Sequence, residues 1–242
     1  MNNRIKSAWA DTRLLFRSVP PVMLTFFTLS VVLMNILANK TVYQSGMIAV
    51  DGGIVVSWLS FVCMDILTKA FGPKAATKLS VFAMLTNLFV CLIFGIVSAI
   101  PTKEDFSAFN TIIGGTWFIV LSSMTAFTAS ALVNNFSNWA IGSLFRKNPD
   151  GKLAYVTRSF VSTFVGQFVD NLIFALLVFT VFAPIYWDGF CWTTLQCVTC
   201  AVLGAALELL MEVVFAPIGY SVLKRWEKAG IGKEYNDRRN AK

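Results

Sequence analysis

Six long apolar stretches divide this chain, and they restrict its fold more than any other feature of the sequence. They are expected near residues 22–43, 53–68, 76–100, 112–144, 155–185 and 193–223. A helix needs about 20 apolar residues to cross the hydrocarbon core of a bilayer, and all but the second stretch reach that length. The pattern predicts an all-α membrane protein with six transmembrane helices in a single domain over 1–242.

Basic residues are distributed unevenly between the segments that join these stretches. Lys40 and Lys103 are the only two of the 20 Lys and Arg residues that fall on one side of the predicted bundle, and the other 18 fall on the opposite side. Segments rich in Lys and Arg stay in the cytoplasm. The distribution therefore predicts that both termini are cytoplasmic, with an amphipathic segment over 1–21 and a basic tail over 224–242.

The composition limits the kinds of function that this chain can have. It is 56% hydrophobic, its mean hydropathy is +0.67, and it contains no His. Without His, an enzyme loses the commonest general base and most catalytic zinc sites, so we expect no catalysis, no metal and no cofactor. The net charge of +7 lies mainly in the predicted cytoplasmic segments, so we expect anionic lipid headgroups as partners and no nucleic acid.

The cysteines give little indication of function. Cys197 and Cys200 have C-x-x-C spacing, but they lie in the sixth stretch without a second pair nearby in the sequence. Packing inside the membrane is the simpler interpretation, and a metal or redox role is the alternative.

Polar side chains follow one face of the fifth stretch. Gln167, Asp170 and Phe174 are spaced by three and four residues, so they share that face of a helix. Hydrogen bonding between helices can explain hydroxyls and amides in such positions. A carboxylate in hydrocarbon costs at least about 2.5 kcal/mol and needs a charged partner or several donors. We therefore predict that Asp170 and Gln167 bind substrate.

Other stretches carry similar polar groups. Asn135 and Asn138 share a face of the fourth, where an amide can recognise the edge of a heterocycle or bind a neighbouring helix. Glu208 and Glu212 lie one turn apart in the sixth, and we expect both to face the cavity that contains Asp170. Two such carboxylates in a low dielectric require a proton or a cation. Further candidates, nearer the ends of their stretches, are Asn35, Asn39, Asp65 and Arg158.

The sequence resembles the VUT family of bacterial queuosine precursor transporters along nearly its whole length. The matching segments are residues 35–40, 65–72, 128–130, 158–170 and 216–220. The resemblance implies a six-helix protein of the bacterial inner membrane that imports 7-deazaguanine precursors of the tRNA nucleoside queuosine. It also implies an architecture similar to the substrate-binding subunits of energy-coupling-factor vitamin transporters, without an ATPase module. The chain departs from residues common in the family at Lys69, Asn138 and Glu208.

The candidate residues are chemically compatible with such a substrate. A carboxylate such as Asp170 can accept from two adjacent N–H groups of a 7-deazaguanine. An aromatic side chain such as Phe174 can cover its flat ring. Later precursors carry a protonated amine on a side arm, for which Glu208 or Glu212 is suitable.

Two other functions remain open. A vitamin-binding subunit would need an energy-coupling partner, which docks on a patch of small residues on a cytoplasmic half-helix. The nearest such group is Ala201, Gly204 and Ala205, but it lies in the outer half of the sixth stretch. A membrane scaffold would bind no purine-like ligand. The sequence does not decide between the nitrile precursor, the aminomethyl precursor and queuine, or between a monomer and a homodimer.

Overall fold

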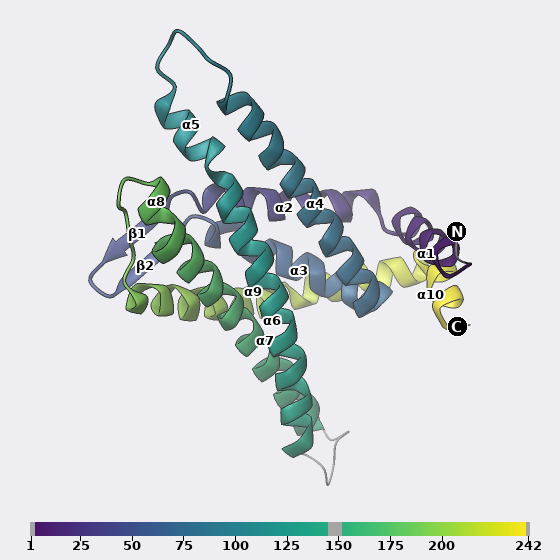
Figure 1. The fold of residues 1–242 in the computed structure, drawn as a ribbon. Helices are drawn as coiled ribbons and strands as arrows, with labels where there is room; N and C mark the ends of the chain where they lie inside the picture. Colours follow the sequence, from purple (N-terminus) through teal and green to yellow (C-terminus); the bar gives the residue numbers. More distant parts are fainter. Residues whose placement is uncertain (1–2, 145–151, 241–242) are drawn as a thin grey trace.

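The computed structural model describes residues 3–144 and 152–240, which are mostly helical (Figure 1). Five helices in this part of the chain are long and apolar enough to cross a membrane. A sixth span is obtained if α1 (Asn3–Ser18) and α2 (Pro21–Leu37) are counted as one pair, which is bent by 99°. Pro20 and Pro21 explain the bend, because proline cannot continue a helix but fits the first turn of the next one. The chain is therefore a multi-pass helical membrane protein.

The long helices follow the predicted stretches closely. They are α3 (Ile54–Phe71), α4 (Pro73–Ser98), α6 (Thr116–Leu144), α7 (Lys152–Ala175) and α9 (Thr194–Lys228). Two of the predicted stretches contain breaks. The fourth begins with the separate short helix α5 (Ser107–Gly114), and the fifth continues from α7 into the π-helical segment η1 (Leu176–Phe182) and then α8 (Ala183–Tyr186).

The segment after α2 departs from the predicted all-α architecture. Strands β1 (Thr41–Ser45) and β2 (Ile48–Asp51) pair antiparallel, and Gly46 at their turn has a φ of +54°. β-branched and aromatic residues favour strands, and glycine adopts positive φ without steric strain. The first span was predicted to reach residue 43, but α2 ends at Leu37 and a hairpin follows.

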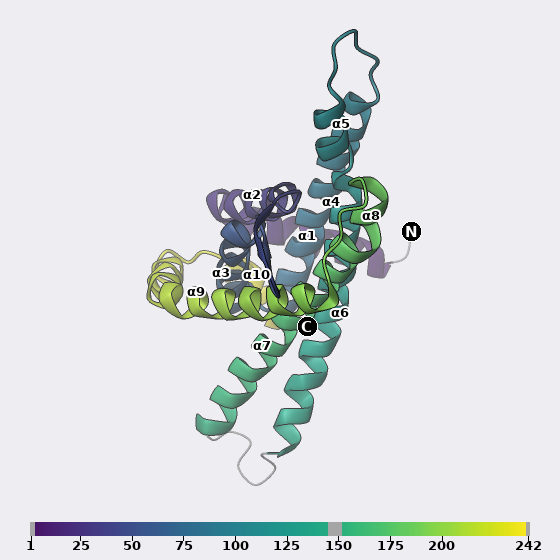
Figure 2. The ribbon, with the colours of Figure 1, turned by 90° about the vertical axis from the view of Figure 1, so that its left-hand side faces the viewer.

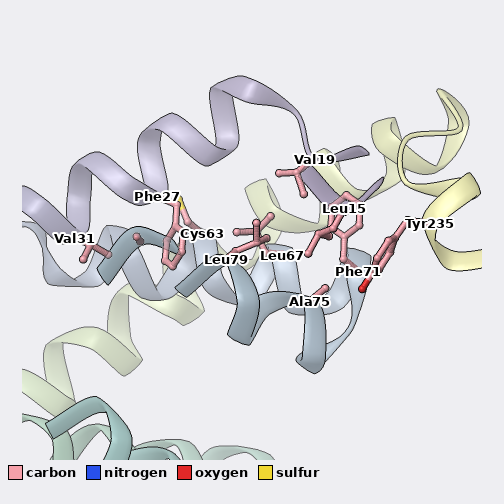
Figure 3. Close-up of a cluster of buried hydrophobic side chains, with 11 residues drawn as sticks. Leu15, Val19, Phe27, Val31, Cys63, Leu67, Phe71, Ala75, Leu79 and Tyr235 are labelled. Carbon is pink, nitrogen blue, oxygen red and sulfur yellow. The ribbon is translucent and has the colours of Figure 1, made fainter. Parts of the chain in front are cut away.

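Two buried apolar clusters hold the helices together. The first joins the four helices α1, α2, α3 and α4 with α10 (Lys233–Asn240). Leu15, Phe71 and Tyr235 meet in it (Figure 3). The second joins the hairpin, α6, α7, η1 and α9, and in it the rings of Phe179 and Trp192 stack with centroids 3.7 Å apart. Side chains from both clusters line the cavities described below.

The two ends of the described chain meet. Figure 1 shows α1 and α10 side by side at one end of α2 and α9, with the hairpin at the other end. Arg238 Nε lies 2.8 Å from Asp11 Oδ1, and Asn236 Nδ2 donates to the carbonyl of Ala70 at 2.9 Å. The basic tail predicted over 224–242 is thus largely helical in its described part and packs on α1 and α3.

The adjoining ends of α6 and α7 extend past the remaining helices (Figure 2). Their exposed apolar side chains include Leu132, Phe136 and Phe160. Such exposure is normal for a helix surface that contacts lipid, where apolar side chains face apolar chains.

Candidate functional site

A cavity lined mainly by α2, α3, α7 and α9 contains many polar side chains. It has an empty volume of about 520 Å³, including the part that opens to the outside, and we call it the first chamber. Its lining, which lies within the described residues, includes no Lys or Arg. The polar lining residues are Asn35, Asp51, Ser57, Ser123, Asp170, Asn171 and Glu208.

Glu208 lies at the centre of a hydrogen-bond network in this chamber. Its side chain is 1% exposed, and its Oε1 accepts from Ser57 Oγ at 2.8 Å. Its Oε2 accepts from Asn171 Nδ2 at 3.2 Å. These bonds join α3, α7 and α9 and fix the orientation of the carboxylate. Among the described residues, no cation forms an ion pair with Glu208.

Helices α7 and α9 approach each other closely at Gly204, one turn before Glu208. A Cβ added to Gly204 would lie 3.0 Å from Asn171 Cγ, which is tighter than ordinary van der Waals contact. A larger residue would therefore displace the amide that donates to Glu208. Small residues at such crossings are typical of packed membrane helices.

Asp170 lies where the first chamber adjoins a second one. Ser130 Oγ on α6 donates to Asp170 Oδ1 at 3.0 Å. Asp170 belongs to the lining of both chambers, and Phe174, one turn along α7, lines the first. Among the described residues the carboxylate has one neutral donor, and it lines both chambers, so it can accept hydrogen bonds from a ligand.

Asp51, at the end of the hairpin, is a third carboxylate in the first chamber. It is 8% exposed, and the Gly53 backbone N–H donates to its Oδ1 at 2.7 Å. Cys200 Sγ lies 3.6 Å from its Oδ2. Burial raises the pKa of Asp51, and the hydrogen bond from Gly53 offsets part of that rise. Cys197 and Cys200 both lie in the second apolar cluster, and Cys200 also contacts Asp51.

The hairpin is fastened to α9 at its turn. Gln196 Nε2 donates to the carbonyl of Gly46 at 3.0 Å, and Thr199 Oγ1 donates to that of Met47 at 2.7 Å. These bonds hold the hairpin against the helix that carries Glu208, so Asp51 keeps its position in the lining.

The second chamber is lined mainly by apolar side chains of α2, α3, α4 and α6. Its empty volume is about 590 Å³, and it shares five lining residues with the first chamber: Met34, Asn35, Phe61, Ser123 and Asp170. Its other polar lining residues are Ser60, Ser80 and Asn87. The two chambers are therefore adjacent parts of one internal space.

Some of the residues that we predicted as a site lie together here, and others do not. Asn35, Asp170, Phe174 and Glu208 line the first chamber. Gln167 is 4% exposed and has an Oε1 without a partner, but it lines neither chamber. The side chains of the predicted residues Asn135, Asn138 and Arg158 lie outside the part of the structure that is described.

Three further predicted residues lie outside both chambers. Asn39 Nδ2 donates to Thr116 Oγ1 at 3.0 Å and so joins α2 to α6. Asp65 pairs with Lys69 at 2.6 Å in a partly exposed i,i+4 bridge. Glu212 has Asp65 and Lys69 as its electrostatic neighbours, so it does not share the cavity of Asp170 as we had expected.

Sequence reasoning missed several lining residues. Asp51 falls between the first two predicted stretches, and the Gly52–Gly53 pair that follows it is a sequence signal of a close approach. A Cβ at Gly52 would lie 2.5 Å from the carbonyl oxygen of Leu37. Ser57 and Asn87 are single polar residues in apolar helices, and nothing in their spacing predicts a shared cavity.

The small residues considered as a docking patch for an energy-coupling partner are not available on the surface. Ala201 and Ala205 are both 0% exposed, and Gly204 packs against Asn171. Their contacts are within the bundle.

Comparison with known proteins identifies the family. The model of the family described as "Putative vitamin uptake transporter" matches residues 51–222, which is more than half of the chain and includes Asp51, Asp170 and Glu208. No curated protein and no solved structure matched the chain. The match agrees with the transporter family predicted from the sequence, and it carries no information on queuosine precursors as substrates. The chain therefore belongs to this family of membrane transporters for vitamin uptake.

Proposed function

We propose that this protein imports a 7-deazaguanine precursor of queuosine across the bacterial inner membrane. Membership of a vitamin uptake family supports a small organic substrate. The main observation in favour of this substrate class is that three carboxylates line one chamber whose lining contains no basic side chain: Asp51 and Glu208, which are buried, and Asp170, which is partly buried. Such a chamber favours a ligand that brings N–H donors or positive charge.

A base of this class has the required groups. It carries N–H donors on its rings and an exocyclic amine, and some precursors add a protonated amine on a side arm. Asp170 accepts from a ring N–H, since Ser130 occupies only part of its capacity. Glu208 faces the side arm, oriented by Ser57 and Asn171. Phe61, which lines both chambers, provides aromatic surface for the flat ring, and Phe174 provides it for the part of the base that reaches the first chamber.

The protein is proposed to work without an energy-coupling partner. The small-residue patch that such a partner would need is buried between α7 and α9. The positively charged segments are proposed to contact anionic lipid headgroups on the cytoplasmic side.

Complementation tests the function directly. A bacterial strain that cannot make queuosine precursors and lacks its own precursor transporter is given this protein and each precursor separately, and queuosine in tRNA is measured. We expect restoration with at least one precursor at external concentrations that do not restore the strain without the protein. The Asp170→Asn variant, present at equal amounts in the membrane, serves as the matched control.

Two results would contradict the proposal. Failure with every precursor, while the protein is present in the membrane, would exclude this substrate class. Restoration only after co-expression of an energy-coupling module would favour the vitamin-binding subunit instead.

A further inference from the structure

One buried acceptor of the second chamber has no partner in the described part of the chain. Asn87, on α4, is 2% exposed and lines this chamber, and no described residue donates a hydrogen bond to its Oδ1. A buried polar group without a partner costs about 1–3 kcal/mol, whereas Leu would fill a similar volume without that cost. Packing therefore gives no reason for Asn at this position. A buried acceptor without a partner, on a side chain that lines a cavity, indicates a ligand that brings a donor.

Three other polar side chains of this chamber make hydrogen bonds within their own helices. Ser60 Oγ donates to the carbonyl of Ser57 at 2.7 Å, and Ser80 Oγ donates to that of Ala76 at 3.1 Å. Asn35 Nδ2 donates to the carbonyl of Val31 at 2.9 Å. The hydroxyls of Ser60 and Ser80 are thus satisfied among the described residues, whereas the amide oxygen of Asn87 is buried there without a partner.

The apolar lining of the chamber is suited to a flat aromatic ligand. Four of the chain's eight Met residues line it, namely Met34, Met64, Met84 and Met124. Phe27, Phe61 and Phe127 complete the aromatic part of its surface. Thioether sulfur makes favourable contacts with aromatic rings, and unbranched Met side chains adapt to the shape of a ligand. Aromatic side chains add offset or edge-to-face ring contacts.

We propose that the second chamber binds the flat ring of the substrate and that Asn87 Oδ1 accepts from its exocyclic amine. This inference rests on the proposed function. The six-membered end of the 7-deazaguanine enters first, which places its exocyclic amine deep in the chamber. The five-membered end then lies near Asp170, which lines both chambers. There the N–H of that ring donates to Asp170, and the side arm extends into the first chamber towards Glu208.

Binding to the purified protein tests the role of Asn87. The ligands are 7-aminomethyl-7-deazaguanine and its analogue without the exocyclic amine, and the variants are Asn87→Leu and Thr86→Val. We expect Asn87→Leu to weaken binding of the first ligand roughly tenfold and to leave binding of the analogue unchanged. Thr86, the adjacent residue, lines neither chamber and donates to its own helix at Phe82, so Thr86→Val should bind both ligands normally.

The melting temperature of the ligand-free variant separates binding from folding. No hydrogen bond of the Asn87 side chain is present among the described residues, so Asn87→Leu should melt at the same temperature as the unmodified protein or higher. Equal weakening of both ligands, or weakening of neither, would overturn the assignment of Asn87.

Thiol labelling locates the ring independently of Asn87. Met84→Cys places a thiol in the second chamber, while the native Cys200 lines the first. Armless 7-deazaguanine should slow labelling at position 84 and leave Cys200 unchanged, as measured by mass spectrometry of each site. Protection of Cys200 alone would place the ring in the first chamber and overturn the proposal. If the unmodified protein binds none of these bases, the proposed function itself fails.

Discussion

Glu208 and Glu212 lie one turn apart on α9, yet they differ in burial and in the charged side chains near them. Glu208 is buried in the first chamber and accepts hydrogen bonds from two neutral donors, Ser57 and Asn171. Glu212 is only partly buried and lies near the Asp65–Lys69 pair of α3. Helical spacing predicts that the two residues share a face, but the neighbouring helix decides what each one meets.

The difference has a physical consequence for function. Lys69 is 57% exposed in its side chain and supplies positive charge near Glu212. A partly exposed carboxylate near a cation and solvent keeps its charge at little cost in free energy, and its charge interactions contribute little to stability. Glu208 has no such neighbour, so its charge must be matched by a proton or by cargo. The structure thus favours Glu208 as the residue that faces substrate.

The largest effect is expected at Asp170, which shares the first chamber with Glu208. Asp170→Asn should abolish uptake of every precursor, because the amide keeps the shape but loses the charge-assisted acceptor. The measurement is accumulation of labelled precursor in cells, with the amount of variant in the membrane determined in parallel. Near-normal uptake would mean that Asp170 has a structural role and does not accept a hydrogen bond from the substrate.

Glu208→Gln should reduce uptake of the amine-bearing precursors by roughly 10- to 100-fold, as expected for loss of a hydrogen bond to a charged group. Uptake of the neutral nitrile precursor should fall less, because it brings no positive charge. Competition between the two precursors in one assay measures the ratio of amine-bearing to nitrile precursor taken up. Equal losses for both would show that Glu208 does not match the charge of the side arm.

Ser57→Ala should have a smaller effect of the same kind. Removing one neutral donor to Glu208 costs about 0.5–1.5 kcal/mol, which is roughly a 2- to 13-fold loss. We expect it to appear in KM for the amine-bearing precursors, since Glu208 is then less well oriented. Ser57→Thr keeps a hydroxyl and should recover most of the uptake; no recovery would indicate that packing at position 57 is responsible.

The smallest effect is expected for Glu212→Gln. Partly exposed charge interactions contribute about 0–1 kcal/mol, so uptake of each precursor should stay within roughly fivefold of normal. The comparison with Glu208→Gln is made in the same cells and with the same precursors. If the two variants are equally impaired, both carboxylates face the cavity and the distinction between them is wrong.

Much of the fold could be predicted because the signals are local. Apolar length predicts where the long helices lie, and Pro20 and the Gly72–Pro73 pair mark where helices end. The hairpin was missed because Thr41, Val42 and Tyr43 continue an apolar stretch, and short apolar runs do not distinguish strand from helix. The break between α5 and α6 agrees with the helix-weakening Gly114–Gly115 pair in the sequence.

The candidate site could be predicted only in part. Asp170 and Glu208 stand out in any membrane sequence, because a carboxylate in hydrocarbon is too costly to keep without a role. Asp51, Asn87 and Ser57 have no such signal, and they reach the chambers from the hairpin, α4 and α3. Their identification needs the packing of segments that are far apart in the chain.

The sequence by itself determined that this protein is a multi-pass membrane protein and which helices carry costly charges, because the bilayer acts on composition and length. Only the tertiary structure decided that Glu208 faces a chamber while Glu212 lies near Asp65 and Lys69, and that Asn87 has an amide oxygen without a partner among the described residues. These outcomes depend on which side chains from other helices come within hydrogen-bond distance. Helical spacing does not contain that information.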